Sequence, residues 1–91
     1  MSATDEPAVT VTVYTRENCT MCHKAIETVE DIALTLEGSV ALDTVNVDTD
    51  PALAAEYGER VPCVFIDGEL AFTYDVDGRS LRLRLLAAAN K

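Results

Sequence analysis

Residues Val9–Cys22 read VTVTVYTRENCTMC, and this stretch decides the fold. Its first half alternates valine with threonine or tyrosine at a period of two, which predicts a β-strand with one buried face. A polar loop, Thr15–Asn18, follows, and beyond it apolar residues recur at helical spacing until Gly38, where a helix is expected to stop. The two cysteines, Cys19 and Cys22, are therefore expected where a strand ends and a helix begins.

The remainder of the chain predicts three more strands and two more helices. Asp50 and Pro51 supply a cap and a first helical residue, Gly58 lies just past the same helix, and Asp77 can cap the last helix. Asp67-Gly68 between two short apolar runs is typical of a type I′ hairpin turn. The strands are expected at residues 40–47, 63–66 and 69–74, and the helices at 52–57 and 81–89.

The resulting order, βαβαββα, predicts an α/β fold. The first two strands must be parallel through a right-handed helical crossover, and the last two antiparallel through the tight turn. Helices are expected to flank a four-stranded mixed sheet. At 91 residues the chain has room for one domain, expected at residues 9–91, with residues 1–8 forming a flexible polar leader.

The charge and the apolar content of the chain limit the kinds of molecule that it can bind. Sixteen acidic and seven basic side chains give a formal charge of -9, which disfavours binding to nucleic acid or to an anionic membrane. The apolar runs are too short for a membrane span, and the N-terminus shows no secretory signal. We therefore expect an acidic, monomeric, cytoplasmic protein that associates with neither nucleic acid nor membrane.

The spacing of Cys19 and Cys22 carries a specific chemistry. Free amides and the helix dipole at a helix start stabilise an anion, and they lower a thiol pKa from about 8.5 to roughly 3.5–7.5. Cys19 is then the nucleophile. Cys22 lies one helical turn further on, within reach of a mixed disulfide formed on Cys19. In a reducing compartment such a pair is more often catalytic or metal-binding than structural.

Three segments together resemble the glutaredoxins of the thioredoxin superfamily. They are residues 13–22 with the CxxC pair, Val61-Pro62, and the Ile66-Asp67-Gly68 turn. The likeness extends from about Val9 to Ala89 and is nearest to the small glutaredoxin-like proteins. It implies a thioredoxin fold and thiol-disulfide exchange without a bound cofactor.

The resemblance also assigns roles to individual residues. Cys19 matches the nucleophile and Cys22 the resolving cysteine of the family. Pro62 matches the cis-proline, and Val61 would offer its backbone to a substrate thiol in extended form. Arg16 stands where many glutaredoxins place a lysine for a carboxylate of glutathione.

Other positions depart from the family pattern. Thr20 and Met21, which are expected to touch the substrate, include no proline, and Asn18 replaces a tryptophan common in thioredoxins. Arg60 replaces the threonine of the Thr-Val-Pro triplet, and residues 72–76 lack the Gly-Gly and Asp of glutathione-binding members. We thus expect the substrate to be a protein disulfide or the mixed disulfide of a small thiol. We expect the external reductant to be glutathione, another low-molecular-weight thiol or a reductase.

Two further residues allow other interpretations. Cys63 and His23 are candidate auxiliary residues near the CxxC pair, although each fits an ordinary structural role, as a strand cysteine and an exposed histidine. With Cys19 and Cys22 they form an alternative ligand set of three cysteines and one histidine for zinc, and the cysteines of two chains together could hold an iron-sulfur cluster. The catalytic interpretation needs no metal. A redox-silent interaction domain with the same fold is the third alternative.

Four aspartates could also serve as ligands of a cation. They are Asp48, Asp50, Asp75 and Asp77. Because all four precede expected helices, capping of helix starts is the better interpretation.

Overall fold

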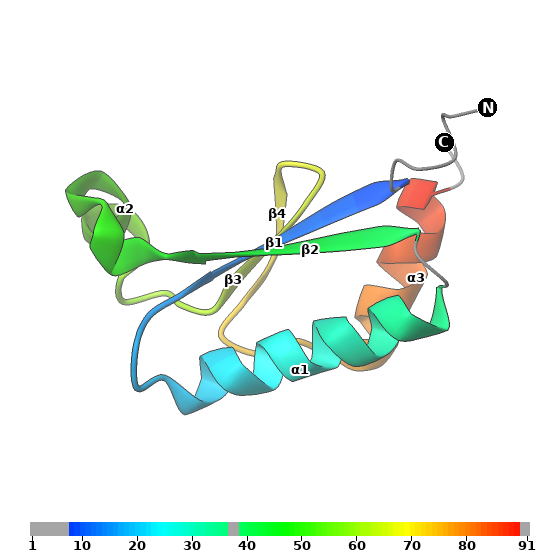
Figure 1. Cartoon of the computed structure of the whole chain (residues 1–91), viewed down its shortest axis with the longest axis horizontal. Helices are drawn as coiled ribbons and strands as arrows, with labels where there is room; N and C mark the ends of the chain where they lie inside the picture. The colour runs from blue at the N-terminus through cyan, green and yellow to red at the C-terminus, as the bar shows by residue number, and fades with distance from the viewer. Residues whose placement is uncertain (1–7, 37–38, 90–91) are drawn as a thin grey trace.

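A computed structural model describes residues 8–36 and 39–89 (Figure 1). Its elements, in chain order, are β1 (Val9–Thr15), α1 (Thr20–Thr35), β2 (Val40–Asn46), the 3₁₀-helix η2 (Val47–Thr49), α2 (Pro51–Tyr57), β3 (Cys63–Ile66), β4 (Glu69–Thr73) and α3 (Gly78–Ala89). The expected βαβαββα order is confirmed, with η2 as an addition. Gly38, the expected stop of the first helix, and residues 1–7 of the expected leader lie outside the described residues.

β1 lies inside the sheet, whose strand order is β2-β1-β3-β4. It pairs with β2 in parallel, so that Val11 lies opposite Leu42, and with β3 antiparallel, so that Val11 also lies opposite Ile66. β4 joins β3 antiparallel through the hairpin. The sheet is therefore four-stranded and mixed, as the sequence predicted.

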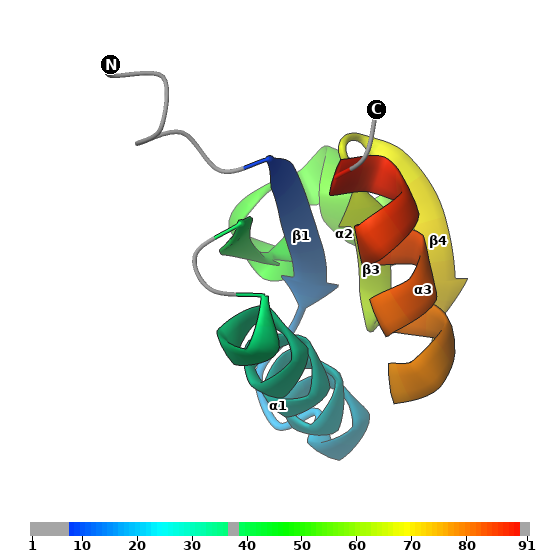
Figure 2. The ribbon, with the colours of Figure 1, turned by 90° about the vertical axis from the view of Figure 1, so that its right-hand side faces the viewer.

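The core lies on one face of this sheet. Val9, Val11 and Val13 are at most 1% exposed and point to the same side, where Val29 of α1 and Leu85 of α3 meet them. Figures 1 and 2 show α1 running along the sheet with α3 beside it. The period of two in β1 thus selects the face on which both long helices pack.

Among the described residues, the helix that packs on the other face is α2, at one end of the sheet. Tyr57 of α2 meets Tyr14 and Phe65 of the sheet, with ring centroids 5.0 and 5.9 Å away and nearly perpendicular planes in both pairs. Edge-to-face contacts of this kind add to the stabilisation from buried apolar area. α2 has only seven residues, so this aromatic cluster is confined to the end of the sheet where β1 stops.

Short polar contacts set the element boundaries. β2 ends at Asn46, one residue earlier than expected. The side chain of Asn46 accepts a hydrogen bond from the backbone N–H of Asp48 and caps the start of η2. β4 ends at Thr73 rather than at Tyr74, whose φ of 67° leaves the extended region. α3 begins at Gly78, three residues before the expected start, because the Asp77 carboxylate accepts the Ser80 amide and hydroxyl.

The hairpin turn follows the sequence prediction. Asp67 and Gly68 have φ of 50° and 87°, the two positive values of a type I′ turn. Asp67 also exchanges two hydrogen bonds with the backbone of Thr10, which ties the turn to β1. Within the part of the chain that the structure describes, no helix combines the length and the apolar character needed to cross a membrane.

Truncation of Leu85 to alanine should test the core. The Leu85 side chain is fully buried, so its loss leaves a cavity and should lower the free energy of unfolding by about 2–5 kcal/mol. Leu83, two residues away in α3, is 62% exposed, and Leu83→Ala should change it by less than about 0.5 kcal/mol. Urea denaturation of both variants measures the difference, and equal losses would contradict the packing described above.

Candidate active site

The CxxC pair begins where the chain turns from β1 into α1. Asn18 has φ of 60°, a left-handed conformation that asparagine tolerates better than most residues, and it reverses the chain just before the helix. Cys19 is the N-cap of α1, and its Sγ accepts the backbone N–H of Cys22 at 3.2 Å. The expected position of both cysteines at a strand-to-helix junction is confirmed.

Cys19 and Cys22 form a disulfide, with Cα atoms 5.2 Å apart. This separation lies within the usual range of about 4.4–6.8 Å. Cys22 is fully buried, whereas Cys19 is partly exposed. Of the two cysteines, Cys19 is therefore the one that solvent reaches.

The surroundings of Cys19 favour an anionic sulfur. The backbone N–H of Cys22 donates to the Cys19 sulfur, which lies at the positive end of the helix dipole, and the first turn of the helix carries no acidic side chain. His23 is exposed, and its backbone N–H donates to the Cys19 carbonyl oxygen at 3.2 Å. Stabilisation of a thiolate thus comes from backbone groups, which are present at any pH.

The Val61-Pro62 peptide bond is cis, as the resemblance implied. Pro62 is buried and Val61 is partly exposed. β3 starts directly after them, with Cys63 opposite Tyr14, so this peptide lies at the end of the sheet from which β1 leads to Cys19. The amide of Tyr74 donates to the Pro62 carbonyl at 2.9 Å and braces it from the β4 side.

Cys63 lies in a different environment from the CxxC pair. It is fully buried, and alternation along β3 puts Val64 in the core with α1 and Cys63 on the side of Tyr57 and α2. Its Sγ donates to the Arg60 carbonyl at 3.4 Å, and burial raises the pKa of the thiol. Cys63 is thus held as a neutral thiol, and its auxiliary role stays a prediction.

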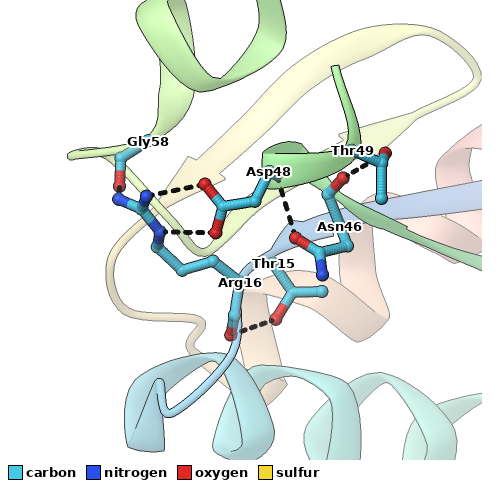
Figure 3. A network of polar contacts seen from close by, with 6 residues as sticks. All are labelled: Thr15, Arg16, Asn46, Asp48, Thr49 and Gly58. Atoms are coloured by element: carbon cyan, nitrogen blue, oxygen red, sulfur yellow. Dashed lines mark hydrogen bonds and ion pairs between the residues drawn. The ribbon is translucent and has the colours of Figure 1, made fainter. Parts of the chain in front are cut away.

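Arg16 is engaged with the chain itself (Figure 3). Its Nε and Nη2 donate to the two carboxylate oxygens of Asp48 at 3.2 and 2.7 Å, and its Nη1 donates to the Gly58 carbonyl at 2.7 Å. A Cβ on Gly58 would lie 3.2 Å from Nη1 and 2.5 Å from the Ala54 carbonyl oxygen, so glycine permits this close approach. Arg16 thereby ties the loop before Cys19 to η2 and to the end of α2.

The Asp48 partner was not identified from the sequence, which assigned this aspartate to helix capping. Thr15 of β1 pairs with Asn46 of β2, so the residues that follow these parallel strands, Arg16 and Asp48, come close together. That register is the signal that could have located the pair. Asp50 and Asp77 do cap α2 and α3, as expected.

The remaining predicted site residues lie on the surface around the disulfide. Thr20 is exposed at the start of α1, and Met21 is 45% exposed and lines a groove of about 320 Å³ shared with Tyr74 and Val76. Within residues 8–36 and 39–89, no three His, Cys, Asp or Glu side chains are grouped so as to hold a metal ion. The four residues of the metal alternative, Cys63 and His23 included, therefore do not form such a group.

Comparisons with known proteins identify proteins that are similar to this chain. A family model described as "Glutaredoxin-like domain (DUF836)" matches residues 10–86. A thioredoxin from Methanocaldococcus jannaschii is 32% identical over 65 residues, which covers 70% of this chain and 76% of that protein.

Two solved structures are similar in sequence and in fold. A structural-genomics target protein from X. campestris has a TM-score of 0.68 and 33% identity, over 85% of this chain and 96% of that one. A mutant thioredoxin from Halobacterium salinarum has a TM-score of 0.66 and 25% identity, over 94% of this chain and 79% of that one. The α/β fold with its mixed sheet is thus a thioredoxin fold, and its close CxxC pair fits a redox role. The chain belongs to the glutaredoxin-like domain family.

Proposed function

We propose that this protein is a thiol-disulfide oxidoreductase that reduces protein disulfides or mixed disulfides through Cys19 and Cys22. One observation carries the proposal. Cys19 is partly exposed and is the N-cap of α1, and its sulfur accepts the backbone N–H of Cys22 and is bonded to the sulfur of Cys22, a residue that is fully buried. This asymmetry suits one attacking and one resolving cysteine.

The reaction starts from the reduced pair. The Cys19 thiolate attacks one sulfur of the substrate disulfide, the substrate S–S bond breaks, and the first substrate sulfur leaves and takes up a proton. Cys22 then loses its proton and attacks Cys19 in the mixed disulfide, which releases the second substrate thiol. The substrate gains two electrons, and the protein ends with the Cys19–Cys22 disulfide that the structure contains.

Recovery of the dithiol requires an external reductant. We propose glutathione, another low-molecular-weight thiol or a reductase for this step, in the cytoplasm and without a bound cofactor. Two electrons pass from that reductant to the Cys19–Cys22 disulfide, and each cysteine takes up a proton or remains a thiolate. Of the two sulfurs, that of Cys19 is the one accessible to the reductant.

We propose that residues around the disulfide position the substrate. Val61 would pair its backbone with an extended substrate beside the cis Pro62, and Thr20 and Met21 would contact the chain near the sulfur. Arg16 uses three of its five N–H groups on Asp48 and Gly58, which leaves two for a substrate oxygen.

A redox titration should separate this function from the other two classes. Protein equilibrated in dithiol buffers and alkylated should show, by intact mass, one reversible two-electron step confined to Cys19 and Cys22. The expected potential is about -200 to -270 mV, the range of cytosolic reductants. Cys63 should resist alkylation in the folded protein, because it is buried. Thiols masked until a chelator is added would instead indicate a metal module, and cysteines inert to oxidant an interaction domain.

Single serine substitutions should distinguish the two cysteines. Cys19→Ser should abolish reduction of a synthetic disulfide peptide, because the exposed nucleophile is lost. Cys22→Ser should accumulate a mixed disulfide between Cys19 and the peptide, detectable by mass, because nothing resolves it. Far-UV circular dichroism confirms that each variant is folded. If Cys19→Ser reduces the peptide at the wild-type rate, the proposed function is wrong.

Arg16→Gln and Asp48→Asn should test whether Arg16 contacts substrate. Both changes break the ion pair between η2 and the loop before Cys19, so both should lower the midpoint of unfolding. Only Arg16→Gln also removes the two N–H groups left for substrate, so it should raise the half-saturating peptide concentration more than Asp48→Asn does. The single-turnover rate of pre-reduced protein at increasing peptide concentration measures this. Equal half-saturating concentrations would limit Arg16 to holding the loop.

A further inference from the structure

The groove beside the CxxC pair adjoins both parts of the proposed active site. Met21, which lines it from α1, lies between the two cysteines in the sequence. Tyr74 lines it from the segment after β4. The backbone N–H of Tyr74 donates to the Pro62 carbonyl oxygen, and its hydroxyl donates to the Glu59 carbonyl oxygen at 3.3 Å. A substrate chain that reaches Cys19 therefore has this groove next to it.

Two large, exposed residues, Met21 and Tyr74, give the groove apolar walls. Met21 is 45% exposed and Tyr74 is 50% exposed, although both are large and apolar enough to be buried in most folds. The methionine side chain is flexible and adapts to different partners, while the tyrosine ring is rigid and favoured at protein interfaces. Such walls suit the side chains of a polypeptide better than a small, highly polar thiol.

The remaining charged residues of the groove give it a negative field. Glu27 and Asp31 lie on α1 with a spacing of four, on one helix face, and Asp75 lies across the groove after β4. Lys24 is the cation among the lining residues. Across residues 8–36 and 39–89 the salt bridge present joins Arg16 and Asp48, so the three carboxylates of the groove are not neutralised by one. The groove thus carries three negative charges against one positive.

We propose that this groove docks a positively charged polypeptide segment beside the disulfide that Cys19 attacks. The inference rests on the proposed function and specifies its substrate class: proteins with lysine or arginine next to the reducible disulfide. Carboxylates on both sides of the groove would pair with these cations while Met21 and Tyr74 contact the apolar parts of their side chains.

Two peptides should reveal the charge preference. Both contain the same intramolecular disulfide, flanked by lysines in one peptide and by glutamates in the other. Pre-reduced protein should react with the lysine peptide about three- to tenfold faster than with the glutamate peptide at low salt, as measured by the second-order rate constant. The ratio should shrink in 1 M salt, because charges at the surface are screened.

Matched variants should separate the groove from the overall charge of -9. Glu27→Gln combined with Asp31→Asn removes two negative charges from the groove and should lower the lysine-to-glutamate rate ratio at least about twofold. Asp43→Asn combined with Glu69→Gln removes two exposed charges outside the groove and should change the ratio less. Lys24→Gln should raise the ratio, because it removes the opposing cation.

Two failures can be told apart. If the wild-type protein reduces both peptides at equal rates, or if the groove variant and its control change the ratio equally, the docking inference is overturned and the oxidoreductase function stands. If the reduced wild-type protein reacts with neither peptide, the proposed function fails and the docking inference fails with it.

Discussion

The rest of the structure depends on how β1 is buried. Its three valines face the helices, its backbone pairs with β2 on one side and β3 on the other, and its end delivers the chain to Cys19. A shift of one residue in its register would turn the valines to the opposite face, expose the core and move the start of α1. The position of the redox pair is therefore fixed by packing some distance from the sulfurs.

The two faces of the sheet contribute differently to the site. α1 and α3 bury one face, and this supplies the stable platform from which α1 presents Cys19. On the other face, α2 and η2 are short, and the loop before Cys19 is held to them by Arg16 through Asp48 and Gly58. Because these bonds lie at the surface, they restrain the loop more than they stabilise the fold.

Local signals made most of the fold predictable from the sequence. The valine alternation, the Asp50-Pro51 helix start and the Asp-Gly turn each act within a few residues, and all three are present in the structure. The Arg16–Asp48 pair was missed because its two residues are 32 positions apart in the chain and meet only through the register of β1 with β2. The groove was missed for a similar reason: β4 must bring Tyr74 beside α1 before Met21 has a partner.

Three cysteines of one chain illustrate how position determines thiol chemistry. Cys63 is buried, which favours the neutral thiol and raises the pKa of that group, and its Sγ donates to the Arg60 carbonyl oxygen. Cys19 lies at a helix start and is partly exposed, both of which favour the thiolate form of its sulfur. Cys22 is buried but lies one turn from Cys19, so its reactivity is confined to that one sulfur. The net charge of -9 disfavours anions in general, and the Cys22 amide together with the dipole of α1 opposes that effect at the Cys19 sulfur.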